Sequence, residues 1–217
     1  MLYIIATPIG NLKDITLRAL DILRSVFLVA CEDTRHTGIL LKEYGIQTPL
    51  TSYYQHNQII KGNYLLKLLQ EGKDVALVSD AGMPGILDPG YSLIKLAIDN
   101  SISMTVIPGP TAFVNALILS GKPAHSFIFD GFLPKGSVSR KNRLVVLKDL
   151  DRTLIFYESS HRILKTLTDI HEVFKEKEVV CVRELTKKFE EVRRGAARDI
   201  LEYFQHHKPR GEFVVII

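Results

Sequence analysis

The sequence predicts an α/β protein of two domains, with a parallel sheet in the first domain and a mixed sheet in the second. In the first half of the 217 residues, short β-branched apolar runs alternate with segments that carry apolar residues at helical spacing. This alternation is typical of parallel strands joined by crossover helices. The regular alternation ends around Gly121-Lys122-Pro123. We therefore expect one domain at residues 1–118 and another at residues 119–217.

The elements of the first domain are predicted from the spacing of its apolar residues. Short apolar runs predict strands at 2–6, 27–31, 49–53, 75–78 and 104–107. Apolar stripes at the helical period predict helices at 16–23, 34–43, 59–69, 91–98 and 111–119. Gly72 is expected to end the third of these helices, and Pro89 suits the first turn of the fourth.

The second domain shows the same two periods in a less regular order. Strands are predicted at 127–129, 153–157, 179–182 and 213–217, with an edge strand near Val192. A basic helix is expected through Arg140 and Lys148, followed later by helices at 160–174 and 196–204. Ser159 or Ser160 caps the N-terminus of the helix at 160–174 in the alternative that gives the segment 157–162 no functional role.

The composition is that of an ordinary soluble globular protein, since 46% of the residues are hydrophobic and 24% are charged. No apolar run approaches the roughly 20 residues that a membrane-spanning helix needs. The N-terminal residues lack the basic lead of a signal peptide and are expected to form the first strand. Cys31 and Cys181 each lie beside valines, which predicts buried free thiols in a reducing compartment. We therefore expect a cytoplasmic protein.

The net charge of +4 is unevenly distributed along the chain. Residues 1–120 hold 9 Lys and Arg against 10 Asp and Glu, whereas residues 121–217 hold 19 against 14. The second half therefore carries a net charge of +5, which favours a polyanionic partner there. Clustered Lys and Arg also occur on ordinary solvated faces, so the charge alone does not identify the partner.

The glycine-rich stretch 79–90 follows the buried strand 75–78 and holds too many Gly, Pro and Asp residues for a regular element. Three other predicted strands end in similar loops, which begin at Thr7, Glu32 and Pro108. Because parallel strands end at one edge of a sheet, we expect the four loops to converge on one ligand. The dinucleotide, triphosphate and thioredoxin-like motifs are absent, as is any closed zinc spacing, so no metal is expected. The alternative is an ordinary set of strand-to-helix connections.

Three segments at strand ends each place an acid, a hydroxyl and a base within a few residues, namely 32–36, 157–162 and 184–188. Such groups suit proton transfer and phosphate binding, and the same residue types also cap helices. The side chains that could handle a proton are Asp33, His36, Glu158, His161 and Lys187. A Ser-His-Asp hydrolase is not supported, because the nucleophile elbow G-x-S-x-G is absent.

Six segments, in their order and spacing, resemble one family. They are Ala6-Thr7-Pro8-Ile9-Gly10-Asn11-Leu12, Cys31-Glu32-Asp33-Thr34-Arg35, Ser79-Asp80-Ala81-Gly82-Met83-Pro84-Gly85, Pro108-Gly109-Pro110-Thr111-Ala112, Phe132-Leu133-Pro134 and Tyr157-Glu158-Ser159-Ser160-His161-Arg162. These segments are similar to those of the bacterial small-subunit ribosomal RNA cytidine 2′-O-methyltransferases of the tetrapyrrole methylase superfamily. The resemblance runs from the first strand to the last.

The resemblance implies two α/β domains with S-adenosylmethionine bound in the cleft between them, and a homodimer. The implied substrate is the ribose 2′-hydroxyl of a decoding-centre cytidine in the 16S ribosomal RNA of the small subunit. The implied cofactor contacts are Pro8, Asp80, Met83, Gly85, Thr111, Ala112, Phe132, Leu133, Gly211 and Glu212. Many family members continue into a helical C-terminal extension, whereas this chain stops at Ile217. We expect RNA contacts made by that extension to be absent or supplied otherwise.

Within this family we expect Asp33 and Glu158 to orient or deprotonate the ribose hydroxyl, with His161 and Arg35 as further catalytic residues. The expected RNA contacts are Arg35, Lys135, Arg140, Lys141, Arg162, Lys187, Arg193 and Arg194, with Arg143 also in the basic helix. Other branches of the superfamily methylate porphyrinoid precursors. A porphyrinoid methyltransferase and a non-catalytic RNA-binding assembly factor are therefore the alternatives.

Overall fold

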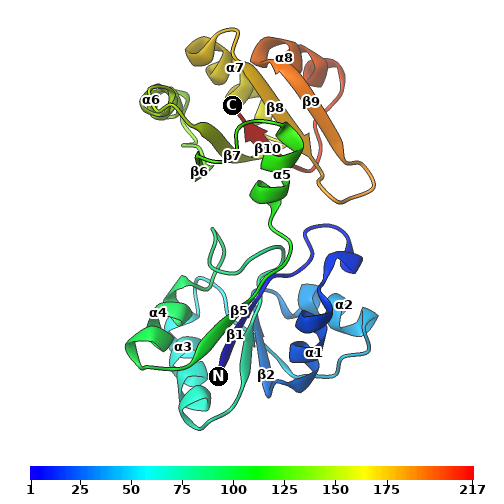
Figure 1. Cartoon of the computed structure of the whole chain (residues 1–217), viewed down its shortest axis with the longest axis vertical. Helices are drawn as coiled ribbons and strands as arrows, with labels where there is room; N and C mark the ends of the chain where they lie inside the picture. The colour runs from blue at the N-terminus through cyan, green and yellow to red at the C-terminus, as the bar shows by residue number, and fades with distance from the viewer. The chain divides into compact units, whose positions relative to one another are not determined.

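The computed structural model describes all 217 residues and divides them into two compact units, Met1–Thr111 and Ala112–Ile217 (Figure 1). The predicted boundary after residue 118 lies inside helix α5, Ala112–Ser120, which belongs to the second unit. The domain boundary itself stays a prediction. None of the helices combines the length and the apolar character that a crossing of the bilayer requires.

The first unit contains a five-stranded sheet in which every neighbouring pair of strands is parallel. Its strands, in the spatial order β3-β2-β4-β1-β5, are Leu50–Ser52, Leu28–Cys31, Val75–Leu77, Leu2–Ile5 and Met104–Ile107. The predicted parallel sheet is confirmed. Since the strands share one direction, their carboxyl ends lie along one edge, where the four loops of interest begin.

Helices cover both faces of this sheet (Figure 1). On one face α1, Leu17–Ser25, and α2, Thr34–Glu43, pack against one apolar cluster of strand side chains. On the other face α3, Gln58–Gln70, and α4, Tyr91–Asp99, pack against a second cluster. A short 3₁₀ helix, Leu12–Asp14, follows β1. The strands are apolar on both sides because both sides are covered.

The second unit holds a mixed sheet in the order β6-β7-β10-β8-β9. These strands span Phe127–Phe132, Thr153–Ser159, Glu212–Ile216, Glu178–Arg183 and Glu191–Ala196. Strands β6 and β7 are parallel, β10 is antiparallel to both β7 and β8, and β8 is antiparallel to β9. It follows that β6, β7 and β8 run in one direction and end at the same edge. The predicted mixed sheet is confirmed.

The helices of the second unit are α6, Ser137–Lys148, α7, Ile163–Phe174, and α8, Ala197–His206, in addition to α5. Helices α6 and α7 are joined by a buried ion pair, in which Arg140 Nη2 lies 2.6 Å from Asp169 Oδ2. Ser137 Oγ donates to the other oxygen of Asp169 at 2.8 Å. Arg140 is only 2% exposed, because its guanidinium also donates to two carbonyls of the preceding loop.

Three local predictions are wrong at helix starts. Thr16 is the N-cap of α1, accepting from the Ala19 amide, and is not part of the helix. Pro89 precedes Gly90, the N-cap of α4, so it lies outside the first turn. Neither Ser159 nor Ser160 caps α7, because β7 continues through Ser159 and a turn follows before the helix begins at Ile163. Pairing of Ser159 with Glu212 in the sheet outweighs the local capping preference.

Candidate functional site

Three of the loops at the carboxyl edge of the first sheet are tied together by hydrogen bonds. Thr7, after β1, exchanges two backbone hydrogen bonds with Gly82, at 2.9 and 3.0 Å. The Thr7 hydroxyl donates to the Ser79 carbonyl at 3.0 Å. The amide of Asp33, after β2, donates to Asp80 Oδ1 at 3.1 Å. The predicted convergence of these loops is therefore found within the first unit.

The 79–90 loop folds back on itself at a glycine that no other residue can replace without movement. Gly90 has φ +156°, and a Cβ placed there would lie 2.9 Å from the Gly85 nitrogen. Gly85 itself has φ +85°. The two glycines therefore let the loop close tightly while Asp80 stays at the edge of the sheet.

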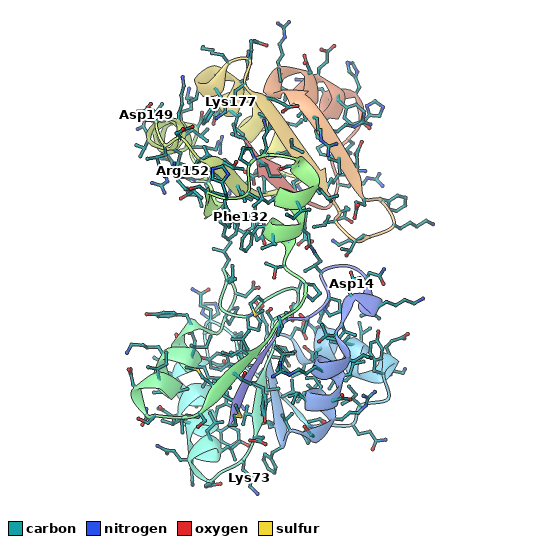
Figure 2. The ribbon with its side chains drawn as sticks, viewed as in Figure 1. Asp14, Lys73, Phe132, Asp149, Arg152 and Lys177 are labelled. Atoms are coloured by element: carbon teal, nitrogen blue, oxygen red, sulfur yellow. The ribbon has the colours of Figure 1, made fainter.

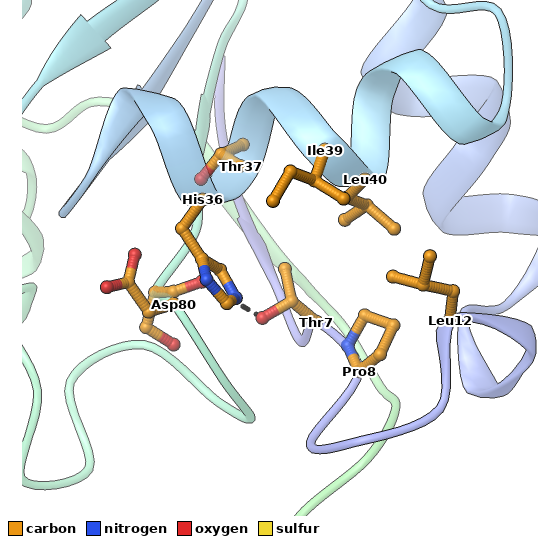
Figure 3. Close-up of a pocket in the computed structure, with 9 residues that line it drawn as sticks. Thr7, Pro8, Leu12, His36, Thr37, Ile39, Leu40 and Asp80 are labelled. Atoms are coloured by element: carbon orange, nitrogen blue, oxygen red, sulfur yellow. Dashed lines mark hydrogen bonds between the residues drawn. The ribbon is translucent and has the colours of Figure 1, made fainter.

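A pocket of about 70 Å³ opens where these loops meet α2 (Figure 3). Its apolar part comes from the β1 loop and from α2, and its polar part includes His36 and Asp80, which Figure 3 shows beside Thr7 and Pro8. The lining residues are Thr7, Pro8, Leu12, His36, Thr37, Ile39, Leu40, Ser79 and Asp80. An apolar cavity of this small volume with a few converging polar groups suits one part of an organic ligand.

The carboxylate of Asp33 both caps a helix and pairs with a cation. Its carboxylate accepts from the Arg35 amide at 2.8 Å as the N-cap of α2, and from Arg35 Nη2 at 2.6 Å as an ion pair. The side-chain hydrogen bond from Arg35 is the main cause that lowers the pKa of Asp33 to about 2. Asp33 is therefore ionised at neutral pH and is a weak proton acceptor, better suited to orienting a hydroxyl than to taking its proton.

Other carboxylates and a thiol lie near Asp33. Burial, followed by the charges of Asp80 and Asp33, raises the pKa of Glu32. Burial also raises the pKa of the Cys31 thiol to about 11 and that of Cys181 to about 12. Both cysteines are buried and free, as predicted, and neither is poised as a nucleophile.

In the second unit, Glu158 is buried at the carboxyl end of β7 and is 2% exposed. Its carboxylate accepts from the Ser159 amide at 2.8 Å and from the Thr166 hydroxyl at 2.6 Å. Arg162 Nε lies 3.3 Å from the same carboxylate. With these partners Glu158 holds the turn at 159–162 in place, whereas His161 on that turn is exposed.

Arg162 connects this turn to the end of β6. Its Nη2 donates to the carbonyls of Leu133 at 2.6 Å and Pro134 at 3.2 Å. Phe132, which directly precedes Leu133 and is labelled in Figure 2, is 54% exposed. Its ring meets the Tyr157 ring edge-on, with 5.8 Å between the ring centres. Glu158, through Arg162, therefore determines where the segment 132–134 lies.

The third acid–base segment is tied to the start of β10. Lys187 Nζ contacts Glu184 Oε1 at 2.8 Å and Glu212 Oε2 at 2.9 Å. Burial raises the pKa of Glu184, but the ammonium of Lys187 and the Glu212 amide outweigh it and leave the pKa lowered. Burial lowers the pKa of Lys187, yet the two carboxylates leave it raised. A side chain at Gly211 would collide with the Glu184 carboxylate.

Several cations expected to bind RNA are occupied by other groups of the chain. Arg140 is buried against Asp169, so we leave it out of the RNA contacts proposed below. Lys141 pairs with Glu172, and Arg143 with Asp130. Arg193 pairs with Glu191 and its guanidinium carbon lies 3.7 Å from the centre of the Tyr203 ring. Arg194 donates to the Leu119 carbonyl. Lys135 is exposed.

The apolar wall of the pocket was not predicted from the sequence. Leu12, Ile39 and Leu40 form much of it. Ile39 is an exposed apolar residue on α2, away from the buried stripe of that helix. An isoleucine at a helical position outside the apolar stripe is a signal that could have marked this wall.

The residues implied for S-adenosylmethionine are compatible with a small, partly apolar ligand that carries amino and hydroxyl groups. Pro8 and Asp80 line the pocket, and Oδ1 of Asp80 accepts a hydrogen bond from the Asp33 amide. Met83 packs on the core beside α4, and Thr111 and Ala112 lie where the first unit ends and α5 begins. Phe132 is exposed, Leu133 is buried, and Glu212 starts β10 directly after Gly211. The role of each residue stays a prediction.

The chain matches the family model for tetrapyrrole (corrin/porphyrin) methylases over residues 1–201. It is similar along its whole length to proteins named ribosomal RNA small subunit methyltransferase I. That of Thermotoga maritima is 46% identical with 97% of its length covered, and that of Escherichia coli O157:H7 is 46% identical with 77% covered. The Bacillus subtilis protein of that name is 42% identical with 74% covered.

Solved structures with the same fold are more distant in sequence. The uroporphyrin-III-C-methyltransferase from Thermus thermophilus aligns with a TM-score of 0.67 at 22% identity, covering 99% of this chain and 93% of that one. A cobalt precorrin-4 methyltransferase aligns with a TM-score of 0.72 at 18% identity and the same coverages. These likenesses confirm the predicted two-domain α/β fold.

Proposed function

Because the chain belongs to the tetrapyrrole (corrin/porphyrin) methylase family, we propose that it transfers a methyl group from S-adenosylmethionine to RNA. The proposed acceptor is the ribose 2′-hydroxyl of a decoding-centre cytidine in 16S ribosomal RNA. The observation that carries this choice is the identity of 42 to 46% with proteins named for small-subunit ribosomal RNA methylation. The porphyrinoid enzymes share only the fold at 18 to 22% identity.

We propose that the cofactor is held by residues of both units, with Pro8, Asp80, Met83, Gly85 and Thr111 from the first. The second unit would add Ala112, Phe132, Leu133, Gly211 and Glu212. When bound, S-adenosylmethionine supplies an electrophilic methyl group on a sulfonium. Asp80, whose Oδ1 accepts from the Asp33 amide, would accept a hydrogen bond from the cofactor with its other carboxylate oxygen.

The remaining work of the protein is to position the acceptor hydroxyl. The ionised Asp33 would accept a hydrogen bond from that hydroxyl, and Arg35, whose side chain is 90% exposed, would hold an adjacent phosphate. In the second unit, the exposed His161 on the turn after β7 would take a proton. Glu158 would not touch the substrate. It would position Arg162 and, through Arg162, the segment 132–134.

The proposal is tested by offering labelled S-adenosylmethionine with three acceptors. These are small ribosomal subunits that lack the modification, naked 16S RNA, and a porphyrinoid precursor. We expect label only with the ribosomal acceptors, on a ribose oxygen found by nuclease digestion and mass spectrometry. Label in the porphyrinoid would establish that alternative instead. RNA binding without any transfer would indicate an assembly factor.

Variants of Asp33 separate its capping role from its role towards substrate. Asp33→Asn keeps an N-cap side chain but removes the charge, whereas Asp33→Ala removes both. We expect both variants to lose roughly 100-fold in kcat with saturating cofactor, because the hydroxyl is no longer oriented. Only Asp33→Ala should also lower the melting temperature. A kcat for Asp33→Asn within a few-fold of the unmodified enzyme would rule out the proposed role.

Glu158→Ala is expected to act differently from the Asp33 variants. Loss of the carboxylate releases Arg162, and the segment 132–134 that it holds carries two proposed cofactor contacts. KM for S-adenosylmethionine should therefore rise more than kcat falls. Partial rescue by Glu158→Gln, which still accepts from Thr166, would support positioning. A change in kcat alone would contradict it.

We also propose a homodimer located in the cytoplasm, where the proposed ribosomal substrate is found. Exposed apolar side chains at the start of α3 and α4, among them Ile59, Ile60 and Tyr91, offer a surface for self-association. Light scattering during gel filtration measures the mass directly. A mass equal to that of the single 24.5 kDa chain would exclude the dimer.

A further inference from the structure

The connection between β8 and β9, residues 184–190, extends beyond the end of the second sheet as an open loop (Figure 1). Its last paired residues are Arg183 and Glu191. Two exposed residues of this loop are Lys188 and Phe189, which we call the hairpin tip. Phe189 is 66% exposed, although it is a large aromatic side chain.

The base of the loop is held rigidly. Glu184 has φ +50° and Thr186 has φ +66°, conformations that cost energy for residues with a side chain. The Glu190 carboxylate accepts from the Thr186 amide at 2.6 Å, and the Lys187 amide donates to the Glu184 carbonyl at 2.9 Å. Leu185 is buried beneath the loop. The loop therefore presents Phe189 to solvent in a defined position and does not bury it.

The two lysines of the loop differ in whether a carboxylate neutralises them. The ammonium of Lys187 is neutralised by Glu184 and Glu212. Lys188 forms no ion pair, and its Nζ lies 5.7 Å from the centre of the Phe189 ring. Arg210, which immediately precedes Gly211, is also exposed. The tip is thus an exposed aromatic ring beside an unneutralised cation.

Sheet topology brings this tip to the edge that carries the proposed site of the second unit. Strands β6, β7 and β8 end at that edge, and β10 begins there. The same edge therefore holds Phe132, Glu158, His161 and Gly211. A ligand bound to the tip would lie near the proposed methyl-transfer residues of this unit.

We infer that the hairpin tip binds the RNA strand next to the methylated nucleotide, with Phe189 stacked on a base. Lys188 and Arg210 would contact the flanking phosphates. Aromatic stacking combined with cations is how proteins hold single-stranded RNA, since every base has a face on which a ring can stack. A 2′-hydroxyl must also be freed from its surroundings to meet a methyl donor in line. This inference rests on the proposed function and adds the element that holds the substrate strand.

Phe189→Ala tests the stacking. We expect the Kd for unmodified small ribosomal subunits to rise roughly ten-fold or more, because stacking on the aromatic ring is lost. Phe189→Trp should bind within about two-fold of the unmodified enzyme, since it retains a stacking surface. The affinity for S-adenosylmethionine, measured by calorimetry, should not change in either variant. Unchanged RNA binding by Phe189→Ala would overturn the inference.

The first unit provides a matched control. Phe27 is 48% exposed and Lys73 Nζ lies 5.1 Å from its ring centre, so this pair has the same chemistry as the tip. Phe27 precedes β2 and therefore lies at the opposite edge of its sheet from the proposed site. Phe27→Ala should bind RNA as the unmodified enzyme does. Equal losses in both variants would mean a general effect of exposed aromatics and would also overturn the inference.

Two further readouts separate the remaining outcomes. Lys188→Ala should lower the slope of log Kd against log salt by about 0.7, the value for one phosphate contact on a single strand. If Phe189→Ala instead changes the oligomeric state, the tip is an interface between copies and the inference fails. If the unmodified enzyme methylates no RNA, the proposed function fails. A loss of RNA binding on Phe189→Ala would still support the tip in that case.

Discussion

At the scale of single residues, the structure decides which ionisable groups are available. Asp33, with a pKa of about 2, and Glu158, buried with three partners, are both carboxylates at strand ends, yet they suit different tasks. Their partners lie close to them in sequence, but Glu158 is buried whereas the Asp33 side chain is 33% exposed, and burial depends on the packing of the whole unit. Arg140 is a second example. Its position in a basic helix predicted an RNA contact, whereas its side chain forms a buried ion pair with Asp169.

Gly211 yields a prediction at this scale. It has φ +80°, and a methyl group there would displace the Glu184 carboxylate from Lys187. Gly121 has φ +71° with nothing near its missing side chain. Gly121→Ala should therefore lower the free energy of unfolding by about 1 kcal/mol, the cost of the backbone conformation alone. Gly211→Ala should cost about 2 kcal/mol or more, as measured by urea denaturation. Equal losses of stability in the two variants would show that Glu184 moves away from the new methyl group at no cost in free energy.

At the scale of elements, two ion pairs between α6 and α7 offer a direct comparison. Arg140–Asp169 is buried, whereas Lys141–Glu172 is exposed on the same two helices. Removing one partner of a buried pair leaves a desolvated charge without compensation, but removing one partner of an exposed pair leaves a charge in water. The position of α6 on α7 therefore depends mainly on the buried pair.

We expect Asp169→Ala to lower the free energy of unfolding by about 3 kcal/mol or more. Glu172→Ala should lower it by less than about 1 kcal/mol. Chemical denaturation of both variants at neutral pH measures the difference. Similar small losses in the two variants would mean that water reaches Arg140 once Asp169 is removed.

At the scale of the whole molecule, charge follows the division into units. Residues 1–111 carry 9 Lys and Arg against 10 Asp and Glu, and residues 112–217 carry 19 against 14. The net charges are therefore −1 and +5. The excess of cations in the second unit favours binding of a polyanion there, although many of its cations already have partners within the chain.

RNA binding by the intact enzyme should therefore weaken as salt is added, with a slope set by the few unneutralised cations. Substitution of exposed Lys135 by Ala should reduce that slope by about 0.7 for a contact on a single strand. Substitution of Lys141, which Glu172 neutralises, should reduce it less. Filter binding at salt concentrations from about 50 to about 300 mM measures these slopes, because the release of counterions changes the affinity over that range. Affinity independent of salt would exclude an electrostatic contribution from the second unit.

The sequence by itself determined the alternation of strands and helices, the parallel sheet of the first unit and the mixed sheet of the second. It also placed the glycine-rich and acid–base segments at strand ends, because apolar periodicity and turn residues are local properties. Only the tertiary structure decided that Glu158 and Arg140 are buried, that Lys187 is neutralised and that Phe189 is exposed. Those properties depend on packing and on atoms that folding brings into contact, such as Asp169 with Arg140 and Glu212 with Lys187.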